Sequence, residues 1–99
     1  MWILRWTQEQ HEPLTFRLAA GSVKTIGRAT RADFILDAAL VSRVHCRLTA
    51  HSDARLEVQD LGSTNGTYVN GHRITRAELK EGDRLRIGRA ELSVLKYEV

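Results

Sequence analysis

The sequence has little cysteine and no long hydrophobic stretch. Cys46 is its one cysteine, which excludes an internal disulfide and is typical of a protein from a reducing compartment. No apolar run approaches the roughly 18 residues that suggest a membrane-spanning helix. The first residues, Met1 to Trp6, are too short and too soon charged to be a signal peptide. We therefore expect a cytoplasmic protein that does not bind a membrane.

The sequence also lacks the motifs of common enzymes and metal sites. Its glycines form neither G-x-G-x-x-G nor a P-loop, and no paired carboxylates suited to acid–base chemistry are found. The scattered histidines His11, His51 and His72 fit no metal-ligand spacing. Cys46 alternates with Val44 and Leu48, which indicates a small core residue and not a reactive thiol. We therefore expect no enzymatic activity, no cofactor and no metal.

Charge of a single sign is not concentrated anywhere in the chain. The net charge is +3, and the 12 acids are scattered among 15 basic residues, of which 12 are arginines and 3 are lysines. Arginine carries a planar fork of donors that suits phosphate and carboxylate. The arginine excess also favours an alternative function, a small basic β-domain that binds nucleic acid. That alternative lacks the interleaved surface aromatics of a base-stacking platform.

What the chain does have is repeated alternation of apolar and polar residues. The alternation covers residues 14–18, 44–48, 56–58, 85–87 and 92–97. This period of two is typical of half-buried strands, and turn signals such as Ala20-Gly21-Ser22 separate the segments. The pattern predicts about ten short strands, arranged as an all-β antiparallel sandwich or barrel. With 99 residues, the chain has room for one domain, spanning 1–99, with one modest core.

The segment from Asp60 to Ile74 contains two different turn signals. Asn70-Gly71 lies between short apolar segments, which is the strongest short-range signal for a β-hairpin. Leu61 to Gly66 is instead a loop of small hydroxyl and amide residues, whose side chains can bond a ligand or the backbone. The following residues, 75–80, predict a helical turn.

Three loops contain the residues best suited to binding. They are Gly27 to Arg31, Leu40 to His45, and Ser63 to Gly66. If the loops converge at one end of a sandwich, they bring together arginines, hydroxyls and a carboxamide. Arginine neutralises a phosphate and bonds two of its oxygens, and hydroxyls with backbone N–H groups occupy the remaining lone pairs. The set therefore suits a phosphate that is joined to a peptide.

These motifs, in this order, resemble those of the forkhead-associated (FHA) domain. They are Gly27-Arg28, Ser42-Arg43-x-His45, Ser63-Thr64-Asn65-Gly66 and Asn70-Gly71. The resemblance spans roughly residues 23–97, and none of its motif positions departs from the family pattern. It implies a sandwich of eleven strands and a phosphothreonine-dependent binding module of Ser/Thr protein kinase pathways, with phosphorylated proteins as partners.

The resemblance also implies a role for each motif residue. Arg28, Ser42, Arg43 and Thr64 would contact the phosphate. Asn65 would bond the peptide backbone beside the phosphothreonine, and Gly27, His45 and Gly66 would be structural. The family distinguishes threonine from serine by a pocket for the threonine methyl group. A nucleophile–base pair of Ser42 and His45 is the competing interpretation, but no third residue is evident to orient the imidazole.

Leu40 is the residue that we expect to set specificity beyond the phosphate. In the resembled family the loop before the Ser-Arg pair reads the third residue after the phosphothreonine. In this chain the loop is uncharged after Asp37, so burial against Leu40 would favour Ile, Leu or Val there over Asp. The opposite preference would follow if Arg31, Arg73 or Arg76 reached the same position.

Overall fold

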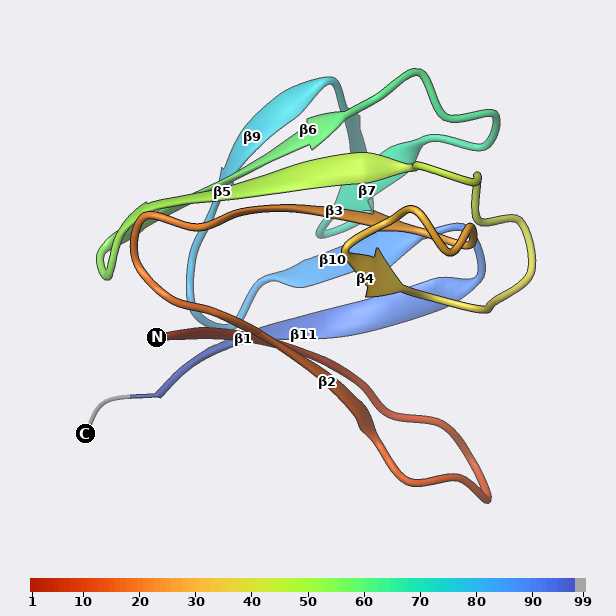
Figure 1. The fold of residues 1–99 in the computed structure, drawn as a ribbon, viewed down its shortest axis with the longest axis horizontal. Coiled ribbons are helices and arrows are strands. Elements are labelled where there is room, and N and C mark those ends of the chain that lie inside the picture. The colour runs from red at the N-terminus through yellow and green to blue at the C-terminus, as the bar shows by residue number, and fades with distance from the viewer. Residues whose placement is uncertain (98–99) are drawn as a thin grey trace.

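The computed structural model describes residues 1–97, which fold into eleven strands in two sheets packed against each other (Figure 1). The strands are β1 (Trp2–Trp6), β2 (Leu14–Leu18), β3 (Val23–Gly27), β4 (Phe34–Ile35), β5 (Cys46–Ser52), β6 (Arg55–Asp60), β7 (Thr67–Val69), β8 (His72–Ile74), β9 (Arg76–Leu79), β10 (Arg84–Ile87) and β11 (Ala90–Lys96). One sheet has the order β2-β1-β11-β10-β7-β8, and the other has the order β4-β3-β5-β6-β9. The prediction of an all-β antiparallel sandwich with about eleven strands is confirmed. Within the described residues, no helix is long and apolar enough to cross a membrane.

The core lies between the two sheets and is built from the predicted alternation. Leu4 and Leu92 point inward from the six-stranded sheet, and Leu48 and Val58 point inward from the five-stranded sheet; all four are fully buried. Because successive strand residues face opposite sides, their neighbours lie on the outer faces. The free thiol of Cys46 is also in the core, where burial raises its pKa and keeps it neutral.

The predicted hairpin at Asn70-Gly71 is confirmed. β7 and β8 pair directly, with Val69 opposite His72. Asn70 and Gly71 have φ values of 50° and 85°, which is the left-handed backbone that a two-residue hairpin turn of this type requires at both central positions.

The predicted helical turn at residues 75–80 is wrong, because this segment contains strand β9. β9 pairs with β6, with Ala77 opposite Val58 and Leu79 opposite Leu56. Leu79 is buried in the core, so a long-range partner supplies both the hydrogen bonds and the apolar contacts that local propensity did not reveal. The predicted strand at 44–48 begins later, at Cys46.

The sequence pattern also did not predict strand β4. It has two residues and runs parallel to the end of β3, with Ile26 opposite Phe34. The ring of Phe34 stacks on Phe16 with centroids 4.6 Å apart. A strand this short has no period to detect, and its position depends on these tertiary contacts.

The two ends of the sandwich carry different parts of the chain. Figure 1 shows the N-terminus and the end of β11 at the left end and the loops around residues 28, 36–45 and 61–66 at the right end. The three loops that the sequence selected therefore lie together, as their chemistry suggested.

Candidate functional site

The three loops form a shallow hollow of about 430 Å³, here called the site hollow. Its lining consists of Arg28, Leu40, Val41, Ser42, Arg43, Thr64 and Asn65. The structure thus brings together all five residues predicted to contact a phosphopeptide, together with the predicted specificity residue Leu40. The structural residues Gly27, His45 and Gly66 lie just beneath this lining.

Gly27 allows the end of β3 to lie directly against the loop that carries Ser42 and Arg43. The N–H of Arg28 donates to the carbonyl of Ser42, and the N–H of Ala29 donates to the carbonyl of Arg43, each at 3.0 Å. A β-carbon on Gly27 would overlap the carbonyl oxygen of Arg43. Only glycine therefore permits this approach, which places Arg28 beside Ser42 and Arg43.

Arg28 and Arg43 supply the positive charge of the site. The Nε of Arg28 donates to the carbonyl of Val41 at 3.2 Å, which holds the side chain over the hollow. Both arginines are exposed, and among residues 1–97 neither has an acidic side chain within salt-bridge distance. The two guanidinium groups are therefore available to an anion.

His45 joins two of the three loops from below and is fully buried. Its Nδ1 accepts a hydrogen bond from the backbone N–H of Ser42 at 3.0 Å, and its Nε2 lies 2.8 Å from the carbonyl oxygen of Gly66. Because the Ser42 N–H can only donate, the ring proton is on Nε2 and is donated to Gly66. Both ring nitrogens are thus engaged with backbone, and the Ser42 hydroxyl has no base at His45.

Two further hydrogen bonds connect the loop that carries Leu40 and Ser42 with the loop that carries Thr64 and Asn65. The N–H of Thr64 donates to the hydroxyl of Ser42 at 3.1 Å, and the Nδ2 of Asn65 donates to the carbonyl of Leu40 at 3.2 Å. The Oδ1 of Asn65 remains available as an acceptor, and the Ser42 hydroxyl retains its proton for donation. The site hollow thus offers donors for a phosphate and an acceptor for a peptide N–H.

Asp60 anchors the loop at residues 61–66 and was not among the predicted site residues. Its carboxylate accepts bonds from the hydroxyls of Ser63 and Thr67 at 2.5 and 2.7 Å, and from the N–H groups of Gly62 and Ser63 at 3.1 Å. Partial burial tends to raise the pKa of Asp60, but the hydrogen bonds from Ser63 and Thr67 lower it below its ordinary value. The signal in the sequence was an acid three residues before Ser63, at the start of a loop of small polar residues.

Leu40 lies at the rim of the site hollow and is 51% exposed. Its φ is +66°, an uncommon value for leucine. The turn at Gly88 supports it: the N–H of Arg89 donates to the carbonyl of Ala39 at 2.9 Å, and an added β-carbon on Gly88 would meet the Leu40 backbone. Arg89 is therefore a basic residue near Leu40 that the sequence did not single out.

The three arginines considered as rivals of Leu40 lie in different places. Arg76 is on β9, where it donates to the Gln59 side chain at 3.2 Å and lies 3.8 Å from the Glu57 carboxylate. Arg73 is on β8, and its Nε would lie 2.8 Å from a β-carbon added to Gly66. Arg31 is exposed in the loop after β3. Of these, Arg73 is next to Gly66 and so close to Asn65.

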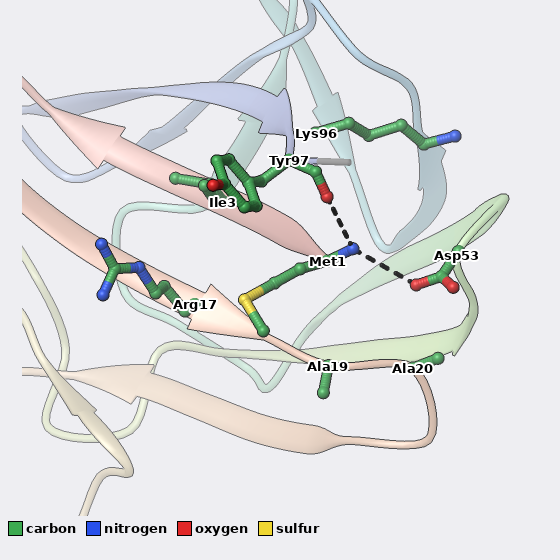
Figure 2. A pocket seen from close by; sticks show the side chains of 8 residues that line it. All are labelled: Met1, Ile3, Arg17, Ala19, Ala20, Asp53, Lys96 and Tyr97. Carbon is green, nitrogen blue, oxygen red and sulfur yellow. Dashed lines mark hydrogen bonds and ion pairs between the residues drawn. The ribbon is translucent and has the colours of Figure 1, made fainter. Parts of the chain in front are cut away.

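A larger hollow, of about 1090 Å³, lies at the opposite end of the sandwich, near the termini (Figure 2). Its lining consists of Met1, Ile3, Arg17, Ala19, Ala20, Asp53, Lys96 and Tyr97. In Figure 2 the Met1 amine bonds the carboxylate of Asp53 and the carbonyl of Tyr97, at 3.3 and 3.1 Å. Among residues 1–97, the side chains that line this hollow do not bring several donors to one point, whereas those of the site hollow do.

Comparison with known proteins identifies the same family that the sequence motifs resemble. The family model of the FHA domain matches residues 24–88. The chain is 40% identical over 79 residues to the ABC transporter ATP-binding/permease protein Rv1747 of Mycobacterium tuberculosis, covering 80% of this chain and 9% of that protein. It is 41% identical over 68 residues to the oxoglutarate dehydrogenase inhibitor of Corynebacterium diphtheriae, covering 69% of this chain and 47% of that protein.

A solved structure is similar over nearly the whole chain. It comes from an analysis of phosphothreonine-dependent FHA domain interactions, and it has a TM-score of 0.83, 30% identity and coverage of 99% of this chain and 98% of that one. The chain spans about half the length, or less, of the two curated relatives described above. These matches give no support to nucleic acid binding.

Proposed function

Because the chain belongs to the FHA domain family, we propose that it is a phosphothreonine-dependent module that binds peptides or proteins in Ser/Thr-kinase signalling. The single observation that carries this proposal is the site hollow, where two exposed arginines, which have no acidic partner among residues 1–97, lie together with two hydroxyls and a carboxamide. The similar solved domain, studied for phosphothreonine-dependent interactions, supports the same function. The proposal takes residues 1–99 as one binding domain without catalytic activity, whose partner is a phosphorylated protein.

The phosphate binds through charge-assisted bonds in this proposal. Arg28 and Arg43 bond its oxygens, and the hydroxyls of Ser42 and Thr64 donate to those that remain. A phosphothreonine carries about −1.5 to −2 charges near neutral pH, so it matches the two guanidinium groups. Asn65 accepts from a backbone N–H of the peptide through Oδ1, while its Nδ2 stays on the Leu40 carbonyl.

The test is calorimetry with a phosphothreonine peptide on the wild type and on variants of the site. Losing a hydrogen-bond partner of the charged phosphate costs about 1.5–3 kcal/mol, so we expect Arg28→Ala and Ser42→Ala each to abolish detectable binding while the domain still unfolds cooperatively. Arg43→Ala weakens binding more than Arg43→Lys. Arg55→Ala is the matched control, because Arg55 is exposed and pairs with Glu78 outside the site. Unchanged affinity in Arg28→Ala would show that this residue does not bind the phosphate.

We also propose that Leu40 selects an apolar residue at the third position after the phosphothreonine. An apolar side chain there buries area against Leu40 at roughly 25 cal/mol per Å², and a carboxylate loses water without gaining a partner. A peptide library randomised at this position is screened on the wild type, on Leu40→Arg and on Arg89→Gln. Selection of Asp by the wild type contradicts the proposal, and loss of that selection in Arg89→Gln would assign it to Arg89.

A further inference from the structure

The outer face of the six-stranded sheet carries five exposed arginines, here called the arginine face. They are Arg5, Arg17, Arg73, Arg84 and Arg86. Strand alternation places them there: Arg84 and Arg86 flank the buried Leu85 on β10, and Arg5 follows the buried Leu4 on β1. The side chains on one face of a strand recur at every second residue, so these arginines share the side that faces away from the core.

The strand register arranges four of these five arginines in two neighbouring rows, and Arg17 lies outside them, opposite Ile3. In the first row, Arg73 is opposite Tyr68, which is opposite Arg86. In the second row, Arg84 is opposite Ser93, which is opposite Arg5. In each row the two arginines lie on strands that are separated by one other strand. At the usual spacing between strands, the backbones of the two arginines are therefore roughly 10 Å apart. The rows form a broad positive surface and not a single pocket.

The charge of this face is poorly compensated within the sheet. On the outward positions of its six strands, the one acid is Glu91, whose carboxylate lies 3.6 Å from Arg84. Arg86 lies over the ring of Tyr68, 4.1 Å from the centroid. This contact orients the guanidinium and leaves its charge in place.

The arginines of the five-stranded sheet have partners within the domain. Arg55 bonds Glu78 at 2.7 Å, and Arg76 lies near Glu57 and donates to Gln59. Arg47 donates to the same Gln59 oxygen at 2.8 Å. The charges there are largely used within the domain, so of the two sheets it is the six-stranded one that carries an excess of arginine over acid on its outer face.

The arginine face is continuous with the site hollow at Arg73. An added β-carbon on Gly66 would lie 2.8 Å from Nε of Arg73, so this guanidinium lies beside the residue that follows Asn65. Arg86 is next in the row, across β7 from Arg73. A chain that leaves the hollow over Asn65 in this direction therefore meets Arg73 first and Arg86 next.

From this continuity we infer that the arginine face is a second docking surface, which binds an acidic segment of the phosphorylated partner. The inference rests on the proposed function. The segment is rich in Asp or Glu and follows or precedes the phosphothreonine, and its carboxylates bond Arg73, Arg86 and Arg84. A base-stacking platform for nucleic acid is less suited to this face, because Arg86 covers the ring of Tyr68.

The experiment compares a core phosphothreonine peptide with the same peptide carrying a run of glutamates on either side. Exposed ion pairs each change affinity by roughly one- to fivefold, so two or three of them give about a tenfold gain at low salt. We expect this gain for the tail on one side, and we expect high salt to suppress it. The variant R84Q/R86Q loses most of the gain, and its affinity for the core peptide stays within about twofold of the wild type.

The matched control is R55Q/R76Q, which removes the same charge from the opposite sheet. The side chains of Arg55 and Arg76 are 55% and 61% exposed, comparable with 69% for Arg84. The control should keep the full gain of the tailed peptide. If the gain falls equally in both variants, net charge alone explains it, and the inference is overturned. Equal binding of the tailed and the core peptides by the wild type would also overturn it.

A second measurement separates this inference from the proposed function. If the core peptide fails to bind, the proposed function fails, and the face is then tested with an unphosphorylated glutamate peptide by NMR. Salt-sensitive shifts of the amides around Arg84, Arg86 and Arg5 support the docking surface, and their absence overturns it. Single-stranded DNA that binds the same amides more tightly than a glutamate peptide of equal charge would also overturn it.

Discussion

His45→Ala is expected to destabilise the domain strongly, because one buried ring holds two loops together. The imidazole is fully buried, accepts from the Ser42 N–H at 3.0 Å and bonds the Gly66 carbonyl at 2.8 Å. Its removal leaves a donor and an acceptor without partners, at roughly 1–3 kcal/mol each, and opens a cavity. We expect a loss of about 3–5 kcal/mol in the free energy of unfolding, a large part of the usual 5–15 kcal/mol.

Urea denaturation followed by tryptophan fluorescence measures this loss. Trp2 is a suitable reporter, because it is 1% exposed and its indole N–H bonds the Ser52 carbonyl at 2.9 Å. His45→Gln retains a donor for Gly66, but its one acceptor oxygen is at the end of the side chain and not at the Nδ1 position that serves Ser42, so its loss of stability should be intermediate. His72→Ala is the control, because His72 is exposed on β8, and we expect it to remain within about 0.5 kcal/mol of the wild type.

The same variant should weaken phosphopeptide binding even where the domain remains folded. His45 sets the position of Ser42 relative to the loop that carries Thr64 and Asn65, so its loss misplaces groups on both sides of the hollow. A destabilisation by His45→Ala of less than about 1 kcal/mol would refute the reasoning. It would mean that Ser42 and Gly66 find other partners without the ring.

Three further predictions concern the anchoring acid, the glycine beneath Arg28 and the ligand. Asp60→Asn should lower stability by about 1–3 kcal/mol at neutral pH. Because the folded-state pKa of Asp60 lies below the ordinary value of 3.8, the contribution of its carboxylate is complete above that value and is lost as pH falls through the folded pKa. The deficit in denaturation midpoints should therefore shrink in acid, and a deficit that is independent of pH would contradict the charge argument. Gly27→Ala should cost about 3 kcal/mol, because its β-carbon overlaps the Arg43 carbonyl. Gly21→Ala, where nothing lies within 4 Å of the added carbon and φ is +88°, should cost about 1–2 kcal/mol, and equal thermal shifts for the two variants would count against the close approach. A phosphoserine peptide should bind about fourfold more weakly than the phosphothreonine peptide, from one buried methyl worth about 0.8 kcal/mol, and equal affinities in calorimetry would rule out a methyl pocket.

The sequence by itself determined the features that depend on local chemistry. Alternation with a period of two identified strands such as β2 and β10, because side chains on a strand face opposite sides whatever its partner is. Asn70-Gly71 determined the β7–β8 hairpin, because few other pairs adopt positive φ twice in succession. The order of the loop motifs selected Arg28, Ser42, Arg43, Thr64 and Asn65, which the structure brings to one hollow.

Other features were decided only by contacts between distant residues. β4 and β9 are strands because β3 and β6 offer them hydrogen-bonding edges, and no local signal reports a partner. His45 reaches Gly66, 21 residues away, and Gly88 supports Leu40 from the far side of the rim. Arg76 and Arg73 looked equivalent in the sequence, but pairing placed one among acids on the five-stranded sheet and the other beside the site. The sequence set how many arginines the domain has, and the sheet register decided which of them share a face, because burial and pairing fix orientation only once the strands have assembled.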